Sequence, residues 1–244
     1  MEEKKFNFPT EVVELPSKGL LYPEDSPLSS GKIEMKYMTA KEEDILTNQA
    51  LIQKGTVLDH LLQALIMTPG IDLKDMITGD KNALFVAARI LGYGKDYTFN
   101  YGGEEYTIDL SELENKVFDE SSITRGVNQF NFTLPTSNVE VTYKLLTGRD
   151  EIKIEKEIEG LKKISKTTSN ELTTRLKYTI TSINGDSEAK SIREFVDNYL
   201  LAKDSRALRE QIRSNQPDID LTFTTYSGEE VAIPVGLSFF WPDI

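Results

Sequence analysis

The chain has 244 residues, of which 39% are hydrophobic and none is cysteine, and its formal net charge is −12. The apolar share predicts a folded core. The lack of cysteine excludes disulfides and thiolate metal sites. An acidic chain repels phosphate backbones, so we expect no nucleic-acid partner and interpret Lys162, Lys163 and Lys166 as a solvated helix face. No apolar run is long enough to cross a membrane and the N-terminus lacks the core of a secretion signal, so no membrane partner is expected.

The first 38 residues are rich in proline, which fixes φ and removes a hydrogen-bond donor. Between the prolines lie short apolar pieces, so we expect an extended N-terminal arm with turns over residues 1–38. The arm is too apolar for a flexible linker and is expected to lie on its own domain or on a partner. Residues 32–38 alternate polar and apolar side chains, which predicts a strand. The prolines are Pro9, Pro16, Pro23 and Pro27.

Three short helices are predicted to follow the arm. Thr39 and Glu42 have the spacing of a capping box, so the first helix is expected to begin there. Thr56 is the expected N-cap of the second helix, whose leucines recur at helical spacing before Pro69. The third helix is predicted over residues 80–91, where glycines end it.

Two β-hairpins, which we call ribbons, are predicted at residues 97–110 and 218–237. Gly102 and Gly103 supply the positive φ angles that the first turn needs. The chain repeats itself here, because Thr-Phe, Tyr-x-Gly-Glu-Glu and Ile occur in this order in each ribbon. Either hairpins simply share turn chemistry, or two similar ribbons serve the two halves of the chain.

The middle of the chain mixes strands and helices. Strands are predicted at residues 129–134 and 139–146, and a charged helix at 150–164. Residues 170–183 fit a helix by spacing but contain many β-branched residues, and we favour helix. Two more helices are predicted at residues 187–201 and 204–213, with Ser187 and Asp204 as N-caps.

These elements predict an α+β fold in which a small helical bundle is followed by two ribbons that flank a mixed region. The predicted units are the extended arm (1–38), a helical module with the first ribbon (39–120), a strand pair with helices (121–217), and the second ribbon with an aromatic tail (218–244).

Little in the sequence indicates catalysis. His60 is the single histidine, and its helix neighbours are expected to be core residues. No nucleophile-elbow motif is present to pair with it. Gly92-Tyr-Gly94 follows a helix, whereas a phosphate loop follows a strand. Carboxylate clusters at residues 42–44 and 218–220 do not form a calcium-loop motif. We therefore expect no catalytic residue, no cofactor, no metal site and no small-molecule substrate.

The two ends of the chain are the best candidates for contact with partners. Three consecutive aromatic residues near the C-terminus are costly to leave in water, so this tail must dock. Docking on its own domain and docking on a partner are both open, and the proline-stiffened segment near the N-terminus poses the same choice. The candidate interface residues are Leu15, Pro16, Leu20, Leu21, Tyr22, Phe239, Phe240, Trp241 and Pro242.

These ends also carry a resemblance. Leu15-Pro-Ser-Lys-Gly-Leu-Leu-Tyr-Pro23 runs into Tyr37-Met-Thr-Ala-Lys-Glu-Glu-Asp-Ile-Leu46, followed by Ile52-Gln-Lys-Gly-Thr-Val-Leu-Asp59, Asp204-Ser-Arg-Ala-Leu-Arg209 and Phe239-Phe-Trp-Pro242. In this order the segments resemble the baseplate hub proteins and hub-assembly factors of T4-like contractile-tail phages. The resemblance spans most of the chain and is strongest over residues 15–66 and at the C-terminus.

Some members of that family carry Cys-x-x-Cys knuckles where this chain has Tyr101-Gly-Gly103 and Thr225-Tyr-Ser-Gly228. The ribbons look like a zinc ribbon without its ligands, and without cysteine they cannot hold zinc in that way. Packing of Tyr, Phe and Ile side chains is expected to hold them instead.

The resemblance implies a non-enzymatic protein that binds other baseplate or hub proteins during tail assembly, acting as a hub component or as a chaperone-like assembly factor. Its implied place is the host cytoplasm during assembly, with the baseplate of the finished virion as the second location. Two alternatives stay open at this point. One is a tail-associated hydrolase of cell-wall sugars that uses paired carboxylates. The other is a cytoplasmic regulator that binds a peptide in an aromatic groove.

Overall fold

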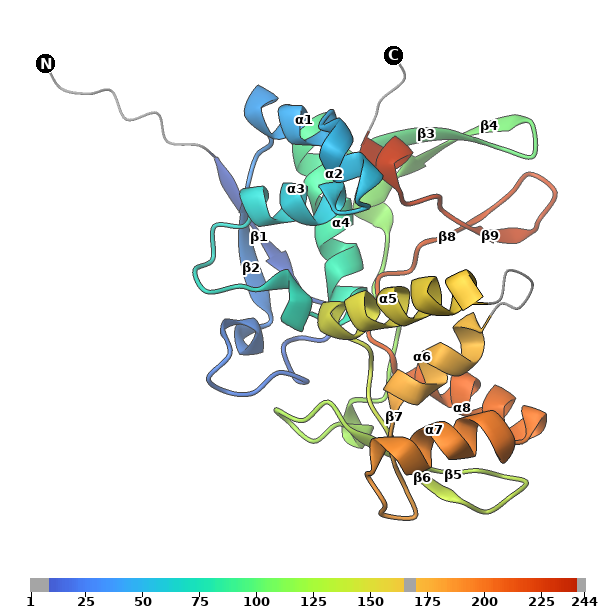
Figure 1. Cartoon of the computed structure of the whole chain (residues 1–244). Helices are drawn as coiled ribbons and strands as arrows, with labels where there is room; N and C mark the ends of the chain where they lie inside the picture. Colours follow the sequence, from blue (N-terminus) through green and yellow to red (C-terminus); the bar gives the residue numbers. More distant parts are fainter. Residues whose placement is uncertain (1–8, 165–169, 241–244) are drawn as a thin grey trace, which may run out of the picture.

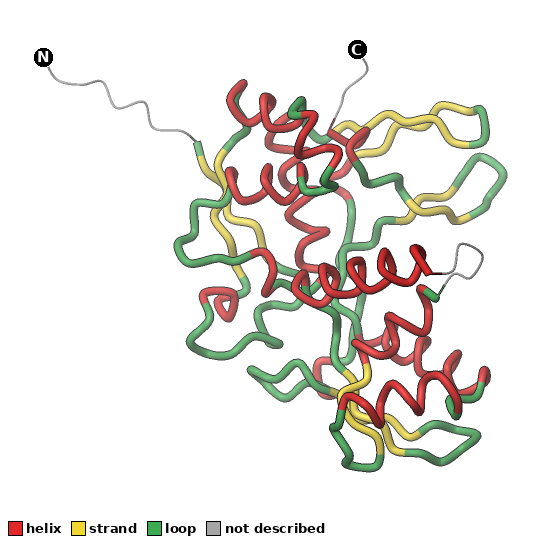
Figure 2. Tube along the Cα trace, in the orientation of Figure 1, coloured by secondary structure: helices red, strands yellow, loops and turns green. Residues whose placement is uncertain are grey.

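The computed structural model describes residues 9–164 and 170–240. They form a mixed α+β fold, which confirms the predicted class. Figure 1 shows α1 to α4 with β1 and β2 at one end, α6 to α8 with β5 to β7 at the other, and α5 between them. The strands form separate small antiparallel sheets, as the tube in Figure 2 makes plain. The helices are α1 (Ala40–Leu46), α2 (Gln49–Gln53), α3 (Val57–Leu65), α4 (Thr78–Tyr93), α5 (Gly148–Ile164), α6 (Glu171–Thr179), α7 (Ala189–Asn198) and α8 (Ala202–Asn215).

The described part of the N-terminal segment is folded into the protein rather than extended from it. β1 (Thr10–Glu14) pairs antiparallel with β2 (Lys32–Lys36) along its whole length. The alternation predicted for β2 buries Ile33 and Met35 completely, because successive side chains point to opposite faces of the strand. Of the two alternatives left open for the predicted arm, the structure shows the first from residue 9 onward, because the extended segment β1 lies on its own chain through its pairing with β2.

The helices after β2 follow the sequence signals closely. The Glu42 carboxylate accepts hydrogen bonds from the Thr39 backbone N–H and hydroxyl, at 3.0 and 2.6 Å, so the predicted start of α1 is confirmed. α2 was not predicted; Asn48 caps it by accepting from two backbone N–H groups. α4 continues through Gly92, where the missing side chain leaves room for Met38, and ends at Gly94.

The middle region confirms one hairpin and corrects one helix. β5 (Phe130–Thr133) and β6 (Glu140–Tyr143) pair as predicted. The helix favoured for residues 170–183 is wrong over its last four residues, because the chain leaves α6 after Thr179 and forms β7 (Ile180–Ile183) against β6. The free edge of β6 decides this, since it offers hydrogen bonds to a β-branched segment that helical spacing alone does not reveal.

The two N-caps predicted in this region are also wrong. The cap residue of α7 is Glu188 rather than Ser187. Asp204 lies inside the first turn of α8, where it is completely buried. Its carboxylate accepts hydrogen bonds from the backbone N–H groups of Thr136 and Ser137, at 2.7 and 3.0 Å. Asp204 therefore stabilises the turn between β5 and β6 instead of its own helix.

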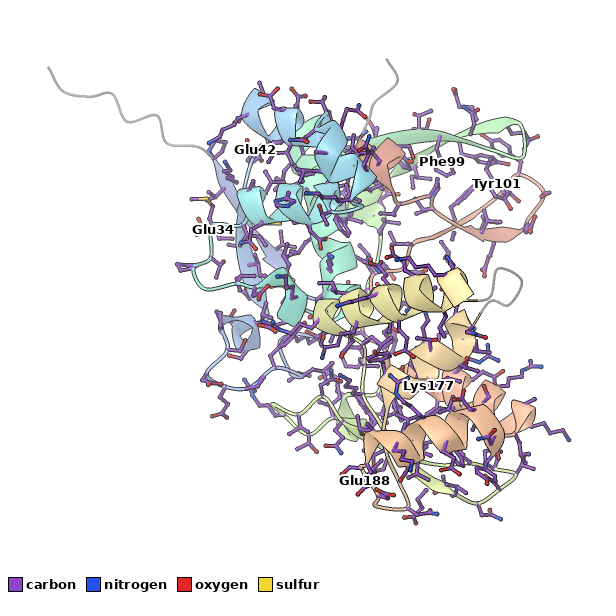
Figure 3. All side chains as sticks on the ribbon, viewed as in Figure 1. Glu34, Glu42, Phe99, Tyr101, Lys177 and Glu188 are labelled. Atoms are coloured by element: carbon purple, nitrogen blue, oxygen red, sulfur yellow. The ribbon has the colours of Figure 1, made fainter. Side chains whose placement is uncertain are left out.

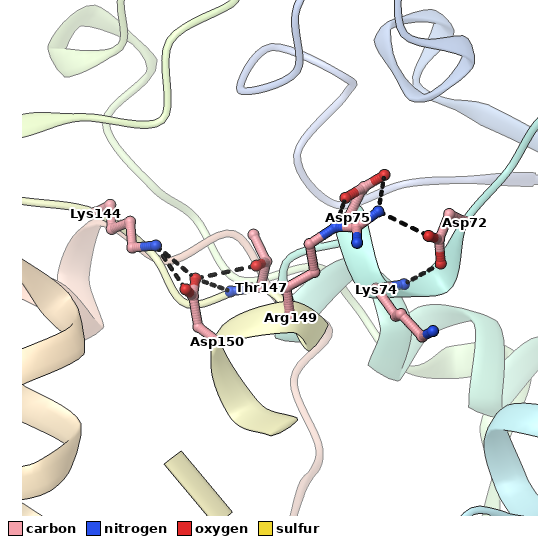
Figure 4. A network of polar contacts seen from close by, with 7 residues as sticks. All are labelled: Asp72, Lys74, Asp75, Lys144, Thr147, Arg149 and Asp150. Atoms are coloured by element: carbon pink, nitrogen blue, oxygen red, sulfur yellow. Dashed lines mark hydrogen bonds and ion pairs between the residues drawn. The ribbon is translucent and has the colours of Figure 1, made fainter. Parts of the chain in front are cut away.

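The start of α5 is attached to both ends of the molecule (Figure 4). Arg149 binds Asp72, at 2.8 Å, and Asp75 in the segment before α4. The buried carboxylate of Asp150 accepts from Lys144 at 2.7 Å and from Thr147. These contacts fix α5 between the two groups of elements.

A half-buried ion pair joins α5 to α7. Arg193 donates to both oxygens of Glu157 at 2.7 Å, and the Tyr178 hydroxyl donates to the same carboxylate at 2.8 Å. The Arg193 hydrogen bonds are the main reason why the pKa of Glu157 is lowered to about 2. Because the folded pKa lies below the unfolded one, this carboxylate stabilises the fold above about pH 4.5 and loses its contribution as pH falls toward 2.

We therefore expect Glu157→Gln to lower the free energy of unfolding by about 2 kcal/mol at pH 7. The difference from the wild type should shrink below pH 4.5 and vanish near pH 2. Urea unfolding followed by circular dichroism across this pH range measures it. Glu194→Gln, at an exposed position on α7, is the control and should have little effect. A difference that stays constant with pH would contradict the assignment.

None of the helices in the described residues is both long enough and apolar enough to span a membrane.

Candidate functional site

The candidate interface residues near the N-terminus lie inside the protein. Leu15, Pro16, Leu21 and Tyr22 are buried and Leu20 is half-buried. Of the two alternatives that the sequence left open, the structure shows docking on the same chain. The prediction of a partner interface is thus corrected for this segment, because its apolar side chains complete the core around α3 and α4.

The same segment is fastened by a buried carboxylate. Asp80, in the first turn of α4, is completely buried and accepts from the Ser17 backbone N–H at 2.9 Å. It also accepts from the hydroxyls of Ser17 and Tyr22, each at 2.6 Å. The Tyr22 hydroxyl in turn accepts from the Ile77 backbone N–H at 3.1 Å. Burial raises the pKa of the Asp80 carboxyl, and burial next to Asp80 raises the pKa of Tyr22 well above its usual value.

The glycine of this segment has a steric role. Gly19 has a φ of +75° and a β-carbon there would lie 2.5 Å from the Ser29 carbonyl oxygen. Gly31, opposite it, has a φ of +68° and an equally close approach to the backbone of Lys18. Only glycine fits two backbones this close in this conformation. The motif at residues 15–23 is therefore a tightly closed loop held by Asp80.

The aromatic tail is also docked on its own chain. Phe239 and Phe240 are completely buried. Phe240 packs edge-on against Phe85 of α4, with ring centres 6.2 Å apart, and Phe239 against Tyr97, at 4.8 Å. The partner interface predicted for these two residues is thus corrected as well. Trp241 and Pro242, like Lys166, lie outside the described residues.

The two ribbons lie side by side. The first consists of β3 (Asp96–Tyr101) and β4 (Glu104–Asp109), and the second of β8 (Thr222–Thr224) and β9 (Glu230–Ala232). Phe99 and Phe223, which occupy equivalent places in the sequence repeat, pack edge-on at 4.9 Å. The ribbons therefore do not serve separate halves of the chain, and they project together from one side of the molecule (Figure 1).

Aromatic packing connects the ribbons to the core without interruption. The rings follow one another at centre distances of 4.6 to 6.2 Å. We call this series the aromatic ladder, and it supports the expectation that Tyr and Phe packing holds the ribbons. Its members, from the core outward, are Phe85, Phe240, Phe239, Tyr97, Phe99, Phe223, Tyr106 and Tyr226, and Tyr101 joins it as a branch that packs on Phe223.

The outer end of the ladder is exposed to solvent. Tyr226 stacks on Tyr106 but keeps 76% of its surface exposed, and Tyr101 keeps 40%. Figure 3 shows Tyr101 nearer the free end of β3 than Phe99. We call residues 101–106 and 225–230 the ribbon tips. Two tyrosines, exposed on a support of buried rings, give the tips a rigid apolar surface.

A wide hollow on the surface of the described residues lies away from the ribbon tips. It is a groove of about 840 Å³ between α5 and the helices α3 and α4, and His60, Asp59, Glu155 and Glu159 are among its lining residues. His60 is exposed rather than part of the core, and within the described chain its imidazole has no hydrogen-bond partner. Asp59 is paired with Lys81. No group within the described chain therefore orients the imidazole of His60 in the way that the histidine of a Ser-His-Asp arrangement is oriented.

The carboxylate clusters considered from the sequence are occupied by internal contacts. Glu42 binds Lys36 at 2.7 Å, and Asp218 binds Asn82 at 3.0 Å. Across residues 9–164 and 170–240, no three His, Asp or Glu side chains converge in a way that could hold a metal ion.

Sequence reasoning missed the ribbon tips as a surface, although the repeated Tyr-x-Gly-Glu-Glu pattern was its signal. It also missed Asp80, whose signal was a carboxylate in the first turn of a helix with an apolar face. Comparison of the chain with protein-family models, with curated proteins and with solved structures finds no match.

Proposed function

We propose that this chain is a baseplate hub protein or hub-assembly factor of a contractile-tail phage, which acts by binding other tail proteins and catalyses no reaction. One observation carries the proposal. The two turns that correspond to the family's cysteine knuckles are about 120 positions apart in sequence, yet the Tyr226 backbone N–H lies 3.4 Å from the Tyr106 hydroxyl. A zinc ribbon with one ligand pair in each turn requires this adjacency. Here stacked rings take the place of the metal.

The buried ends of the chain also support the proposed function. Segments 15–23 and 239–240 carry the resemblance and also form the closed loop and the base of the aromatic ladder. Packing inside the protein constrains which residues can occupy these positions. A sequence resemblance at buried positions therefore supports a similar fold. Binding to partners is then the role of the exposed ribbon tips.

We expect the double substitution Tyr101→Ser and Tyr226→Ser to weaken capture of baseplate proteins at least about ten-fold, because exposed aromatic anchors dominate interface energies. The measurement is affinity purification of the tagged full chain from infected cells, with mass spectrometry of the captured tail proteins. Tyr199→Ser, at a tyrosine of the other end of the molecule whose exposed fraction of 63% lies between those of Tyr101 and Tyr226, is the control and should capture as the wild type does.

Two further measurements separate the proposal from its alternatives. A peptidoglycan assay with purified protein should show no turnover, whereas a tail hydrolase would release sugars. Mass spectrometry of finished particles and of assembly intermediates distinguishes a hub component, present in both, from an assembly factor, present in intermediates alone. If the wild-type chain captured host proteins and no tail proteins, the hub assignment would be wrong.

A further inference from the structure

We infer that the ribbon tips bind an arginine-bearing segment of the partner protein, with guanidinium groups stacked on Tyr101 and Tyr226 between the carboxylates around them. This inference rests on the proposed function, since it specifies the partner of the same surface.

The charged side chains of the ribbons are all negative. Residues 96–109 and 218–232 contain four acidic residues each, and neither stretch contains Lys or Arg. At the base of the ribbons two of the acids are paired from outside, Asp109 with Lys95 and Asp218 with Lys116. These two basic residues reduce the negative charge at the base, so the tips carry the larger share of the excess.

The acids of the tips have no such compensation. Glu104, Glu105, Glu229 and Glu230 are all exposed, and the described part of the chain offers none of them an ion-pair partner. Glu104 accepts a hydrogen bond from the Tyr106 hydroxyl at 2.7 Å, which places one carboxylate directly beside the stacked rings. A cation that reaches the rings thus meets a carboxylate at the same place.

Arginine fits this combination better than lysine or an apolar side chain. Its planar guanidinium stacks on an aromatic face and binds a carboxylate with two parallel N–H groups at once. A purely apolar partner would leave four carboxylates to be desolvated without a counter-charge. Nucleic acid would be repelled by them.

The geometry also favours a segment that lies on the surface rather than one that inserts between the ribbons. The space between them is filled by Phe223, which packs against Phe99 at 4.9 Å and against Tyr106 at 5.0 Å. The Tyr226 hydroxyl closes the gap further by donating to the Glu105 carbonyl oxygen at 3.3 Å. The binding surface is therefore already formed before the partner arrives.

The test is a binding titration of the full chain with a short fluorescent peptide of alternating Arg and Thr, read by fluorescence anisotropy at low and physiological salt. We expect saturable binding, and weaker binding of the equally charged Lys-Thr peptide. Tyr101→Ser with Tyr226→Ser should lower the affinity for the Arg-Thr peptide at least about ten-fold. Glu105→Gln with Glu229→Gln and Glu230→Gln should do the same.

A matched control separates a site from the general negative charge of the chain. Glu24→Gln with Asp25→Asn and Glu194→Gln changes the net charge equally at exposed positions away from the ribbons, and should leave the affinity unchanged. Equal losses in the two triple variants, or equal binding of the Arg and Lys peptides, would overturn the inference. If tail proteins are captured through the tyrosines but the Arg-Thr peptide does not bind, the partner chemistry is wrong and the proposed function stands.

Discussion

Replacing Asp80 with Ala is expected to lower the free energy of unfolding by about 3–5 kcal/mol. The substitution removes the carboxylate to which the hydroxyls of Ser17 and Tyr22 both donate inside the core. It leaves those donors and the Ser17 backbone N–H buried without partners, and each costs its full desolvation. Equilibrium urea unfolding of the full chain at pH 7 measures the loss.

Two companion variants locate the effect. Ser17→Ala removes one donor and keeps the carboxylate, so a smaller loss of about 1–2 kcal/mol is expected. Asp25→Ala, at an exposed position in the neighbouring loop, should change stability little. If Asp80→Ala were as stable as the wild type, the closed loop at residues 15–23 would not depend on this carboxylate, and the account of the motif given above would fail.

Phe239→Ala is expected to destabilise the chain by about 3–5 kcal/mol, since the ring is completely buried and its loss leaves a cavity. Phe239 also supports Tyr97, which stacks on Phe99 at 5.2 Å. We therefore expect the near-ultraviolet circular dichroism of the tyrosines to fall as well, because the ladder loses its base.

The same experiment tests where the tail docks. If the tail belonged to a partner interface, Phe239→Ala would leave the isolated chain as stable as the wild type and weaken binding alone. Phe195→Ala is the control for the loss of an aromatic ring, because Phe195 is half-buried on α7 and lies outside the ladder. It should cost less and leave the tyrosine signal unchanged.

Local signals in the sequence were reliable where the interacting groups are close along the chain. The Thr39 and Glu42 spacing predicted the start of α1, and the glycines at 102 and 103 predicted the turn of the first ribbon. Capping and turn geometry involve a few neighbouring residues, so their physical cause is present in the sequence itself.

The predictions that failed concern groups whose partners lie far away along the chain. Residues 180–183 left the helix because β6 lay beside them, and Asp204 turned from its helix to a loop about 70 positions earlier in the chain. Neither partner is visible in a window of neighbouring residues. A β-branched segment and a buried carboxylate take whichever hydrogen bonds the tertiary structure brings to them.

By itself the sequence determined the fold class, most of the helices and the ribbons, because these follow from local periodicity. It also determined that the apolar ends of the chain must dock, because exposing apolar surface to water is costly. Only the tertiary structure decided that the ends dock on their own chain and that the ribbons stand together with Tyr101 and Tyr226 at their tips. Those outcomes depend on contacts between residues far apart in the sequence, 63 positions for Ser17 and Asp80 and 120 for Tyr106 and Tyr226, which spacing along the chain does not encode.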